Sequence, residues 1–280
     1  MVPQTSHVPK RENLTAHRMR PRAFVFGATG YVGSAVVELL AGDADMEAVV
    51  AHVRPESSSL ERARGQFESL TIRDSDVPVT VDTTPLEAAA FGGTLRRLAP
   101  THLFVCHGTT ARRASAEGID DPYEVIDVGL TALVCEAAAL QETEPRVVYL
   151  SSVGASPKGR GAYLRARGRA EEIVRQSGLP FTICQAPLLN GPDRPERRAG
   201  ETWARRLLDP SLRMLGAIGL TKVRDRYLSM DAGEAAEGLV RCGFHYMTIG
   251  RTVKSDELRR EGVYERERWV PASRRDTDRF

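Results

Sequence analysis

The segment Ala23-Phe24-Val25-Phe26-Gly27-Ala28-Thr29-Gly30-Tyr31-Val32-Gly33 decides the fold, and it leads directly into Ser34-Ala35-Val36-Val37-Glu38-Leu39-Leu40. It predicts a buried strand, a tight glycine turn and an apolar helix. Gly27 permits the unusual backbone angles of the turn, Gly30 leaves room for a pyrophosphate, and Gly33 lets the helix lie close to the strand. The free N–H groups at the helix start then face the phosphates, which assigns Thr29, Tyr31 and Val32 to the same site. The alternative is a tight turn that holds no ligand.

The bulk composition narrows the class of protein. The chain has 280 residues, with 39 Lys and Arg against 37 Asp and Glu, and this balance argues against a dedicated nucleic-acid binder. No apolar run approaches the roughly 18 residues that a membrane span needs. Residues 1–21 are polar and lack the apolar stretch of a secretory signal, so we expect a disordered leader. The four cysteines show no metal-ligand or redox spacing, so we expect reduced thiols, no metal site and a cytoplasmic location.

Apolar segments after the first unit alternate between strand and helix patterns. Strands are expected at residues 46–53, 77–81, 101–106, 146–150 and 181–184, and helices at 123–140 and 163–176. Alternation of this kind predicts a doubly wound parallel sheet, a Rossmann-type α/β fold, over residues 22–186. Residues 187–254 are expected to form substrate-side loops and helices of the same domain, with helices at 202–208 and 231–241. Residues 255–280, dense in mixed charge, are expected to form a surface helix and tail.

Ligands of such sheets bind beyond the carboxyl ends of the strands, and several candidate residues follow strands. Arg54 ends the second strand, where NAD-binding proteins usually place an acid and where an Arg suits the 2′-phosphate of NADP. A solvated surface Arg is the alternative. Gly108 and Thr109 follow the fourth strand, Ser151 ends the fifth and Pro187 follows the sixth. All of them are assigned to cofactor binding.

Three further residues form a candidate acid set for carbonyl reduction. Ser152 ends the fifth strand, and its hydroxyl can hydrogen-bond a developing oxyanion. Tyr163 lies four residues before Arg167 on the next helix, where a neighbouring cation lowers the pKa of the phenol. In the alternative, Arg167 joins a solvent-facing ion ladder with Glu171 and Arg175, and Tyr163 only packs.

In chain order, the strings Gly27-Ala-Thr-Gly30-Tyr-Val-Gly33, Phe104-Val-Cys-His-Gly108-Thr-Thr, Tyr149-Leu-Ser-Ser152 and Tyr163-x-x-x-Arg167 resemble an atypical short-chain dehydrogenase/reductase. Among these proteins, the sequence resembles the Tat-interacting-protein-like group of NAD(P)-binding oxidoreductases. The resemblance implies an NADP-binding Rossmann fold with Ser–Tyr–Lys chemistry, in which Ser152 and Tyr163 match. Position 167 is Arg where the family has Lys, and Gln185 stands near the place of a usual Arg.

The sequence therefore favours an NADP(H)-dependent oxidoreductase that acts on a carbonyl or alcohol by hydride transfer. A catalytically silent NADP-binding regulator or assembly factor is the second hypothesis, and an epimerase or dehydratase is the third. The expected partner is a small-molecule substrate, and a protein partner or an oligomer is compatible with the sequence. The basic residues around Tyr163 form a solvated helix face or a site for an anionic substrate: Lys158, Arg160, Arg165, Arg167 and Arg169.

Overall fold

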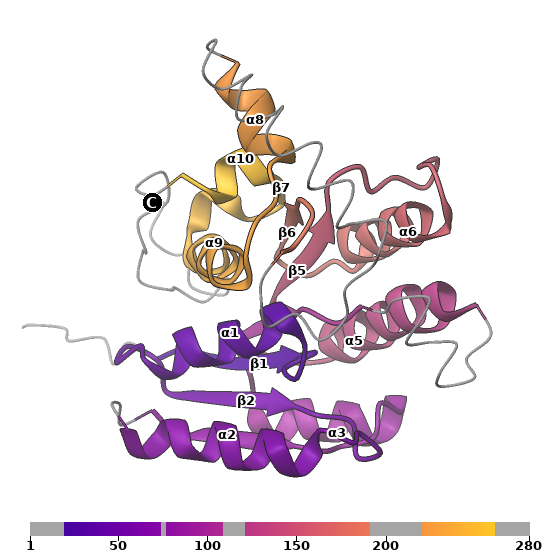
Figure 1. Ribbon diagram of the computed structural model, residues 1–280. Helices are drawn as coiled ribbons and strands as arrows, with labels where there is room; N and C mark the ends of the chain where they lie inside the picture. Colours follow the sequence, from indigo (N-terminus) through magenta and orange to yellow (C-terminus); the bar gives the residue numbers. More distant parts are fainter. Residues whose placement is uncertain (1–19, 74–76, 109–120, 191–219, 261–280) are drawn as a thin grey trace, which may run out of the picture.

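The computed structural model describes residues 20–73, 77–108, 121–190 and 220–260 (Figure 1). Its first half contains β1 (Arg22–Phe26), α1 (Tyr31–Ala41), β2 (Ala48–His52), α2 (Leu60–Arg73), β3 (Val79–Asp82), α3 (Ala88–Leu98) and β4 (His102–Val105). Its second half contains η1 (Tyr123–Gly129), α5 (Leu130–Ala139), β5 (Arg146–Ser152), α6 (Ala162–Gln176), β6 (Phe181–Ala186), α8 (Thr221–Tyr227), α9 (Ala232–Phe244), η2 (Tyr246–Thr248), β7 (Arg251–Lys254) and α10 (Ser255–Leu258).

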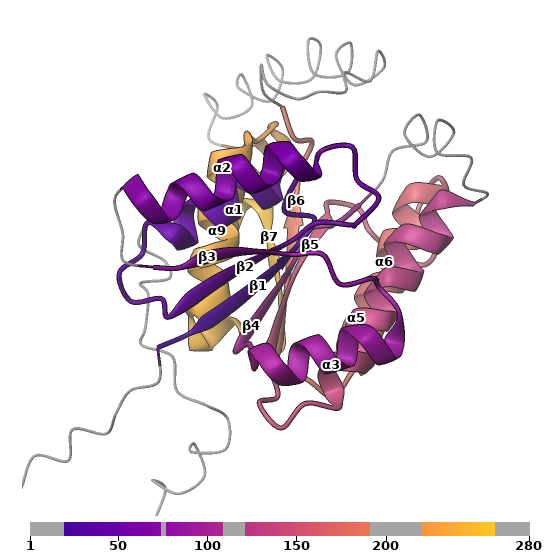
Figure 2. The same cartoon turned by 90° about the horizontal axis from the view of Figure 1, so that it is seen from below.

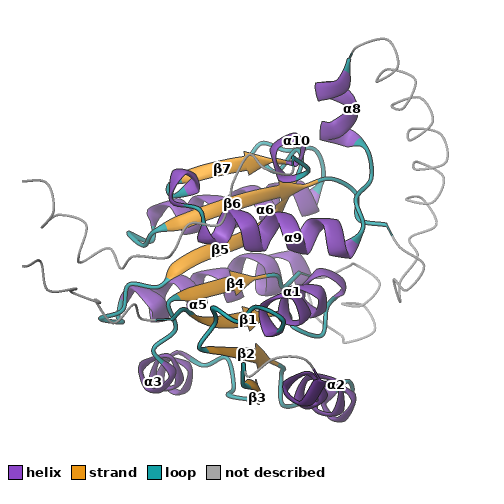
Figure 3. Ribbon diagram, turned by 90° about the vertical axis from the view of Figure 1, so that its left-hand side faces the viewer, coloured by secondary structure: helices purple, strands orange, loops and turns teal. Residues whose placement is uncertain are grey.

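The described strands form one parallel sheet in the order β3-β2-β1-β4-β5-β6-β7 (Figure 3). This arrangement confirms the doubly wound α/β fold expected from the sequence. The strand order reverses between β1 and β4, because β2 and β3 extend the sheet in one direction while β5 to β7 extend it in the other. A ligand of such a sheet binds in the crevice at this reversal, beyond the carboxyl ends of β1 and β4.

Two layers of helices cover the sheet, one on each face (Figure 2). Helices α1, α2 and α9 bury one face, with Val36, Phe67 and Leu239 in the same apolar cluster. Helices α3, α5 and α6 bury the other, where Phe91 and Val174 belong to a second cluster. Strands buried on both faces carry continuous apolar runs, as in Leu103, Phe104 and Val105 of β4.

Several elements differ from the sequence-based expectation. The helix expected over residues 123–140 begins as the π-helical turn η1 and continues as α5. The structure adds β7, which pairs with β6 and lies at one edge of the sheet. α9 confirms the helix expected at 231–241, and Asp231 caps it by accepting a hydrogen bond from the Glu234 N–H at 2.8 Å. The helix expected at 202–208, residues 1–19 of the leader and residues 261–280 of the tail lie outside the described residues.

No helix within residues 20–73, 77–108, 121–190 and 220–260 is long and apolar enough to cross a membrane. The division of the chain at residues 187 and 255 stays a prediction.

Candidate functional site

The glycine turn after β1 has the geometry that its sequence predicts. Gly27 has a φ of +71°, and a Cβ placed there would lie 2.7 Å from the backbone nitrogen of His107. A Cβ at Gly33 would lie 2.1 Å from the carbonyl oxygen of Gly27, so helix and turn meet at backbone contact. The Gly30 N–H donates to the same carbonyl oxygen at 2.8 Å. Gly27 and Gly33 are therefore required by a close approach, and Gly27 also by its left-handed backbone conformation.

The start of α1 fits a diphosphate. Gly30 occupies the N-cap position in extended conformation, and no side chain caps the helix. The first N–H groups of a helix need partners, and the helix dipole favours an anion there. Tyr31, Val32 and Gly33 would contribute through these backbone groups, because the Val32 and Gly33 positions are buried against the core and the Tyr31 hydroxyl donates elsewhere, to the Asn190 carbonyl at 2.7 Å.

A cavity of about 110 Å³ opens beside this turn, where β1, β2 and β4 end. It brings together five of the expected cofactor-binding residues, which come from three separate loops: Gly27, Thr29, Gly30, Arg54 and Gly108. Thr109 lies outside the described residues. The cavity follows the crevice that the strand order creates, so the residues present fit the adenosine side of a dinucleotide.

Two other expected cofactor residues lie apart from this cavity. Ser151 is buried, and its hydroxyl donates to Oε1 of Glu171 at 2.6 Å, an acceptor that also receives the Gln185 amide at 2.9 Å. The Ser151 side chain is therefore committed to α6. Pro187 is buried directly after β6.

Arg167 lies in the interior, not on a solvent-facing ladder. Its side chain is 4% exposed and pairs with Asp127 of η1, with 2.9 Å between Nη1 and Oδ1. Nη1 also donates to the His107 carbonyl at 3.3 Å, and Nη2 donates to the Leu150 carbonyl. The guanidinium carbon sits 4.8 Å from the centre of the Tyr149 ring. Arg167 thus joins η1 and α6 to the carboxyl ends of β4 and β5, and the ladder hypothesis is wrong for it.

The remaining two candidate catalytic residues lie at the same end of the sheet. Ser152 is the last residue of β5 and is half-buried, while Tyr163 is half-buried in the first turn of α6. The Tyr163 ring packs against the Tyr123 ring, with centroids 5.7 Å apart. The loop between Ser152 and Tyr163 is fixed to α6, because the Ser156 N–H donates to the Leu164 carbonyl at 3.1 Å.

Burial keeps His107 and Cys106, two residues that line the cavity, neutral. It lowers the pKa of His107 to about 3, with help from the positive charge of Arg167 and from His52. It also raises the pKa of the Cys106 thiol to about 12, against the opposing effect of Arg167. His107 is therefore a neutral imidazole at physiological pH, and its Nε2 lies 3.2 Å from the Thr131 hydroxyl. Within the described part of the chain, no cluster of His, Cys, Asp or Glu could hold a metal ion.

Sequence reasoning missed Asp127, which is fully buried and balances the charge of Arg167. A polar residue among the apolar positions of the 123–140 segment was the available signal. It also missed Ser229 and Arg259, whose contacts depend on strand β7 and helix α10 bringing the end of the described chain back to the sheet.

Comparison with known proteins places the chain in a family. The NAD dependent epimerase/dehydratase family matches residues 23–237, which include the glycine turn, the Tyr163–Arg167 helix and Asp127. The chain belongs to this family. The expected resemblance to short-chain dehydrogenase/reductases is confirmed at this level, and the family description gives NAD as the nucleotide.

Curated relatives come from fungi. The protein fmp52, mitochondrial, of Aspergillus clavatus is 28% identical over 184 residues, covering 65% of this chain and 71% of its own length. Its counterpart in Aspergillus fumigatus is 30% identical over 183 residues, with the same coverage. All five matching curated relatives are named mitochondrial proteins, and this overturns the cytoplasmic location expected from the cysteines.

Solved structures share the fold. The terminal R domain from the myxalamid PKS-NRPS pathway matches with a TM-score of 0.56 at 18% identity, over 83% of this chain and 65% of that chain. The UDP-glucuronic acid 4-epimerase of Bacillus cereus matches with a TM-score of 0.55 at 15% identity, over 84% of this chain and 80% of that chain. The chain therefore spans about two thirds of the first structure and most of the second.

Proposed function

We propose that this protein is an NADP(H)-dependent oxidoreductase that acts on a carbonyl or alcohol substrate. One observation carries the proposal: the helix that bears Tyr163 and Arg167 meets the rim of the nucleotide cavity. Nη1 of Arg167 lies 3.3 Å from the carbonyl of His107, and a Cβ at Gly108 would lie 3.6 Å from the same nitrogen. Both His107 and Gly108 line the cavity. The candidate acid set thus adjoins the candidate cofactor site.

Each candidate residue has a distinct chemical role in this proposal. A nicotinamide nucleotide held in the cavity would supply the hydride. The Tyr163 hydroxyl donates the proton to the carbonyl oxygen, and the Ser152 hydroxyl donates a hydrogen bond to that oxygen as negative charge develops on it. Arg167 lies one helical turn from Tyr163 on α6, so its side chain joins the helix that carries the proton donor to Asp127 and to the cavity rim.

The preference for NADP over NAD rests on Arg54. This residue follows β2 and lines the cavity together with Ser57, where an acidic residue would instead bind an unmodified ribose. One charge-assisted contact to a 2′-phosphate contributes about 1.5–3 kcal/mol, which corresponds to about tenfold or more in affinity.

The test measures cofactor binding and turnover separately. NADPH and NADH are titrated against protein fluorescence with the wild type and Arg54→Ala, and we expect the variant to lose the preference for NADPH. NADPH oxidation is then screened over a panel of aldehydes and ketones. Tyr163→Phe should lower turnover by about 10²-fold or more at unchanged NADPH affinity. Tyr123→Phe is the matched control, because it alters the ring partner of Tyr163 and keeps the proton donor. Full activity in Tyr163→Phe would refute the catalytic assignment.

A second function is favoured by the contacts of Arg167. Its guanidinium is buried and directed at Asp127 and two backbone carbonyls, an arrangement suited to holding strands together. This supports a catalytically silent nucleotide-binding regulator that passes the redox state of its cofactor to a protein partner. Wild-type inactivity over the whole panel, with activity gained in Arg167→Lys, would favour this function.

A further inference from the structure

Two short segments on the substrate side run in parallel next to the nucleotide site. Residues 188–190 follow β6, and residues 228–230 precede α9. The Asn190 N–H donates to the Met230 carbonyl at 2.8 Å, and the Met230 N–H donates to the Leu188 carbonyl at 2.9 Å. Leu189 and Met230 form a parallel bridge. The two segments therefore behave as one unit, which we call the paired segment.

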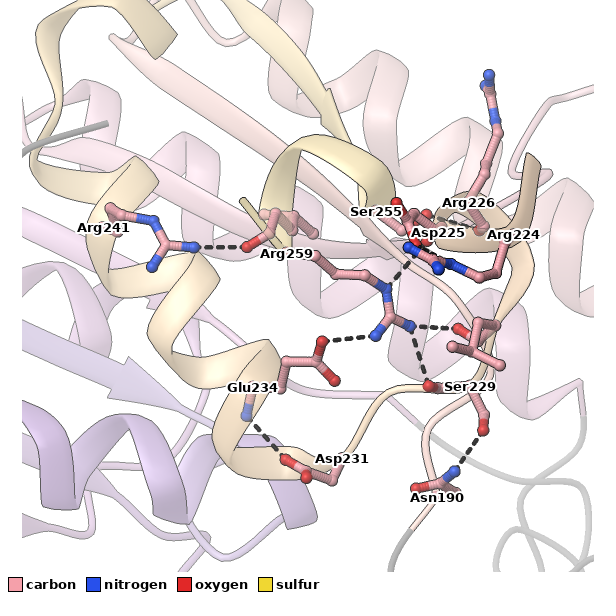
Figure 4. Close-up of polar contacts among 12 residues, drawn as sticks. Asn190, Arg224, Asp225, Arg226, Ser229, Asp231, Glu234, Arg241, Ser255 and Arg259 are labelled. Atoms are coloured by element: carbon pink, nitrogen blue, oxygen red, sulfur yellow. Dashed lines mark hydrogen bonds and ion pairs between the residues drawn. The ribbon is translucent and has the colours of Figure 1, made fainter. Parts of the chain in front are cut away.

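The Arg259 guanidinium lies between Glu234 and the paired segment and bonds to both (Figure 4). It follows α10, and its side chain is 13% exposed. Nε donates to the Asp225 carbonyl at 3.0 Å, and Nη2 donates to the carbonyls of Leu228 and Ser229, the latter at 2.9 Å. Nη1 pairs with Glu234 of α9 at 2.5 Å. A planar fork with several fixed donors can satisfy these acceptors together, whereas a lysine ammonium cannot.

The same set of contacts continues to the glycine turn. The Asn190 side-chain amide donates to the Ser229 hydroxyl, and the Asn190 carbonyl accepts the Tyr31 hydroxyl at 2.7 Å. Tyr31 is the first residue of α1, directly after Gly30. A chain of hydrogen bonds thus runs from Arg259 through Ser229 and Asn190 to the residue that starts the phosphate-binding helix.

We propose that Arg259 is a positioning residue that holds the paired segment, and with it the substrate side of the site, against Tyr31. The inference rests on the proposed oxidoreductase function. Tyr31 would serve the nucleotide only through its backbone N–H. The contacts of Arg259 therefore determine substrate placement, whereas nucleotide affinity depends on the glycine turn. Misplacement of a substrate by a small distance lowers the rate because reacting atoms must meet in a narrow geometry.

The test compares Arg259→Gln with Arg260→Gln in the full chain. Arg260 is a matched control because it is the next residue, is exposed, and pairs only loosely with Asp256 at 3.8 Å. Hydrogen exchange of the Asn190 and Met230 amides should become at least tenfold faster in Arg259→Gln and stay unchanged in Arg260→Gln. NADPH affinity should stay within twofold of wild type in both variants. Tyr31→Phe should accelerate exchange at Asn190, because it removes the hydroxyl that donates to the Asn190 carbonyl.

Activity provides the second readout. For any carbonyl that the wild type reduces, KM should rise at least tenfold in Arg259→Gln, with a smaller change in kcat, and Arg259→Lys should recover part of the loss. Should Arg259→Gln fail to fold, Arg259→Lys is the variant measured, with exchange at Asn190 and Met230 expected to rise severalfold. Unchanged exchange at both amides overturns the inference. Absence of wild-type turnover refutes the proposed function alone, because the exchange and affinity results still decide whether Arg259 holds the segment.

Discussion

Replacing Arg167 by Met tests whether the buried ion pair holds the site together. Met has a similar length and keeps the packing against the Tyr149 ring, but it removes the charge and every donor. The Asp127 carboxylate, which is 0% exposed, then loses the guanidinium at 2.9 Å. The carbonyls of His107 and Leu150 lose a donor as well. An uncompensated buried charge costs about 3–5 kcal/mol, so we expect a loss of this size in the free energy of unfolding.

Such a loss is large against the roughly 5–15 kcal/mol that stabilises a typical domain. Urea unfolding followed by circular dichroism measures it directly. The pair Arg169–Glu124 provides the control, since it joins the same two helices, α6 and η1, with side chains that are 44% and 48% exposed. Arg169→Met should therefore cost no more than about 1 kcal/mol.

A double variant separates charge from packing. Asp127→Asn combined with Arg167→Met removes both charges of the buried pair, so it should recover about 2 kcal/mol relative to Arg167→Met alone. The reasoning is refuted if Arg167→Met costs as little as Arg169→Met. It is also refuted if the double variant is less stable than Arg167→Met, because the loss would then come from packing.

Three further predictions follow from other parts of the structure. The unfolded chain protonates His107 near its ordinary pKa of 6.5, whereas the folded chain does so only near pH 3, so stability should fall as the pH drops below about 6.5. His107 alone accounts for about 1 kcal/mol of this loss at pH 5.5, and the His107→Asn variant does not undergo it. Urea unfolding should therefore show that the stability of wild type relative to His107→Asn is about 1 kcal/mol lower at pH 5.5 than at pH 7.5, and an equal value at the two pH values would contradict the prediction. Gly33→Ala should abolish binding of the proposed dinucleotide and lower the melting temperature, because its Cβ would lie 2.1 Å from the Gly27 oxygen, and normal binding would show that helix and turn can separate. Asp231→Ala should cost about 1 kcal/mol in urea unfolding through loss of the α9 cap, against no change in the exposed control Glu237→Ala.

Local sequence patterns predicted the elements that are strongly apolar and bounded by turn residues. The glycine turn could be located from the sequence because its close approaches are mostly local. Gly33 meets the carbonyl of Gly27 six residues earlier, and Gly27 meets the backbone of His107 just after the neighbouring strand β4. β7 was not predicted, since its four residues include Arg251 and Lys254 and its identity depends on pairing with β6. An edge strand of this kind has no continuous apolar run to mark it.

The candidate site divides in the same way. The sequence could suggest three of the site residues because each lies at the end of a strand or the start of a helix, which the order of the elements fixes. These residues are Ser152, Tyr163 and Arg54. The burial of Arg167 could not be read from its helical spacing, because the spacing to Glu171 and Arg175 fits an exposed ladder equally well. Glu171 does pair with Arg175 at 2.7 Å, while Arg167 turns inward to Asp127, 40 residues earlier in the chain.

The pairing of β6 with β7 has a consequence for how the protein is made. Residues 187–250 separate the two strands, so β6 emerges from the ribosome well before its edge partner exists. During that interval β6 presents a row of unpaired backbone groups, which is the kind of edge that promotes association between nascent chains. Chains that terminate before Arg251 would keep this edge permanently. Premature stop codons late in the coding sequence should therefore yield insoluble protein, although every strand from β1 to β6 is present.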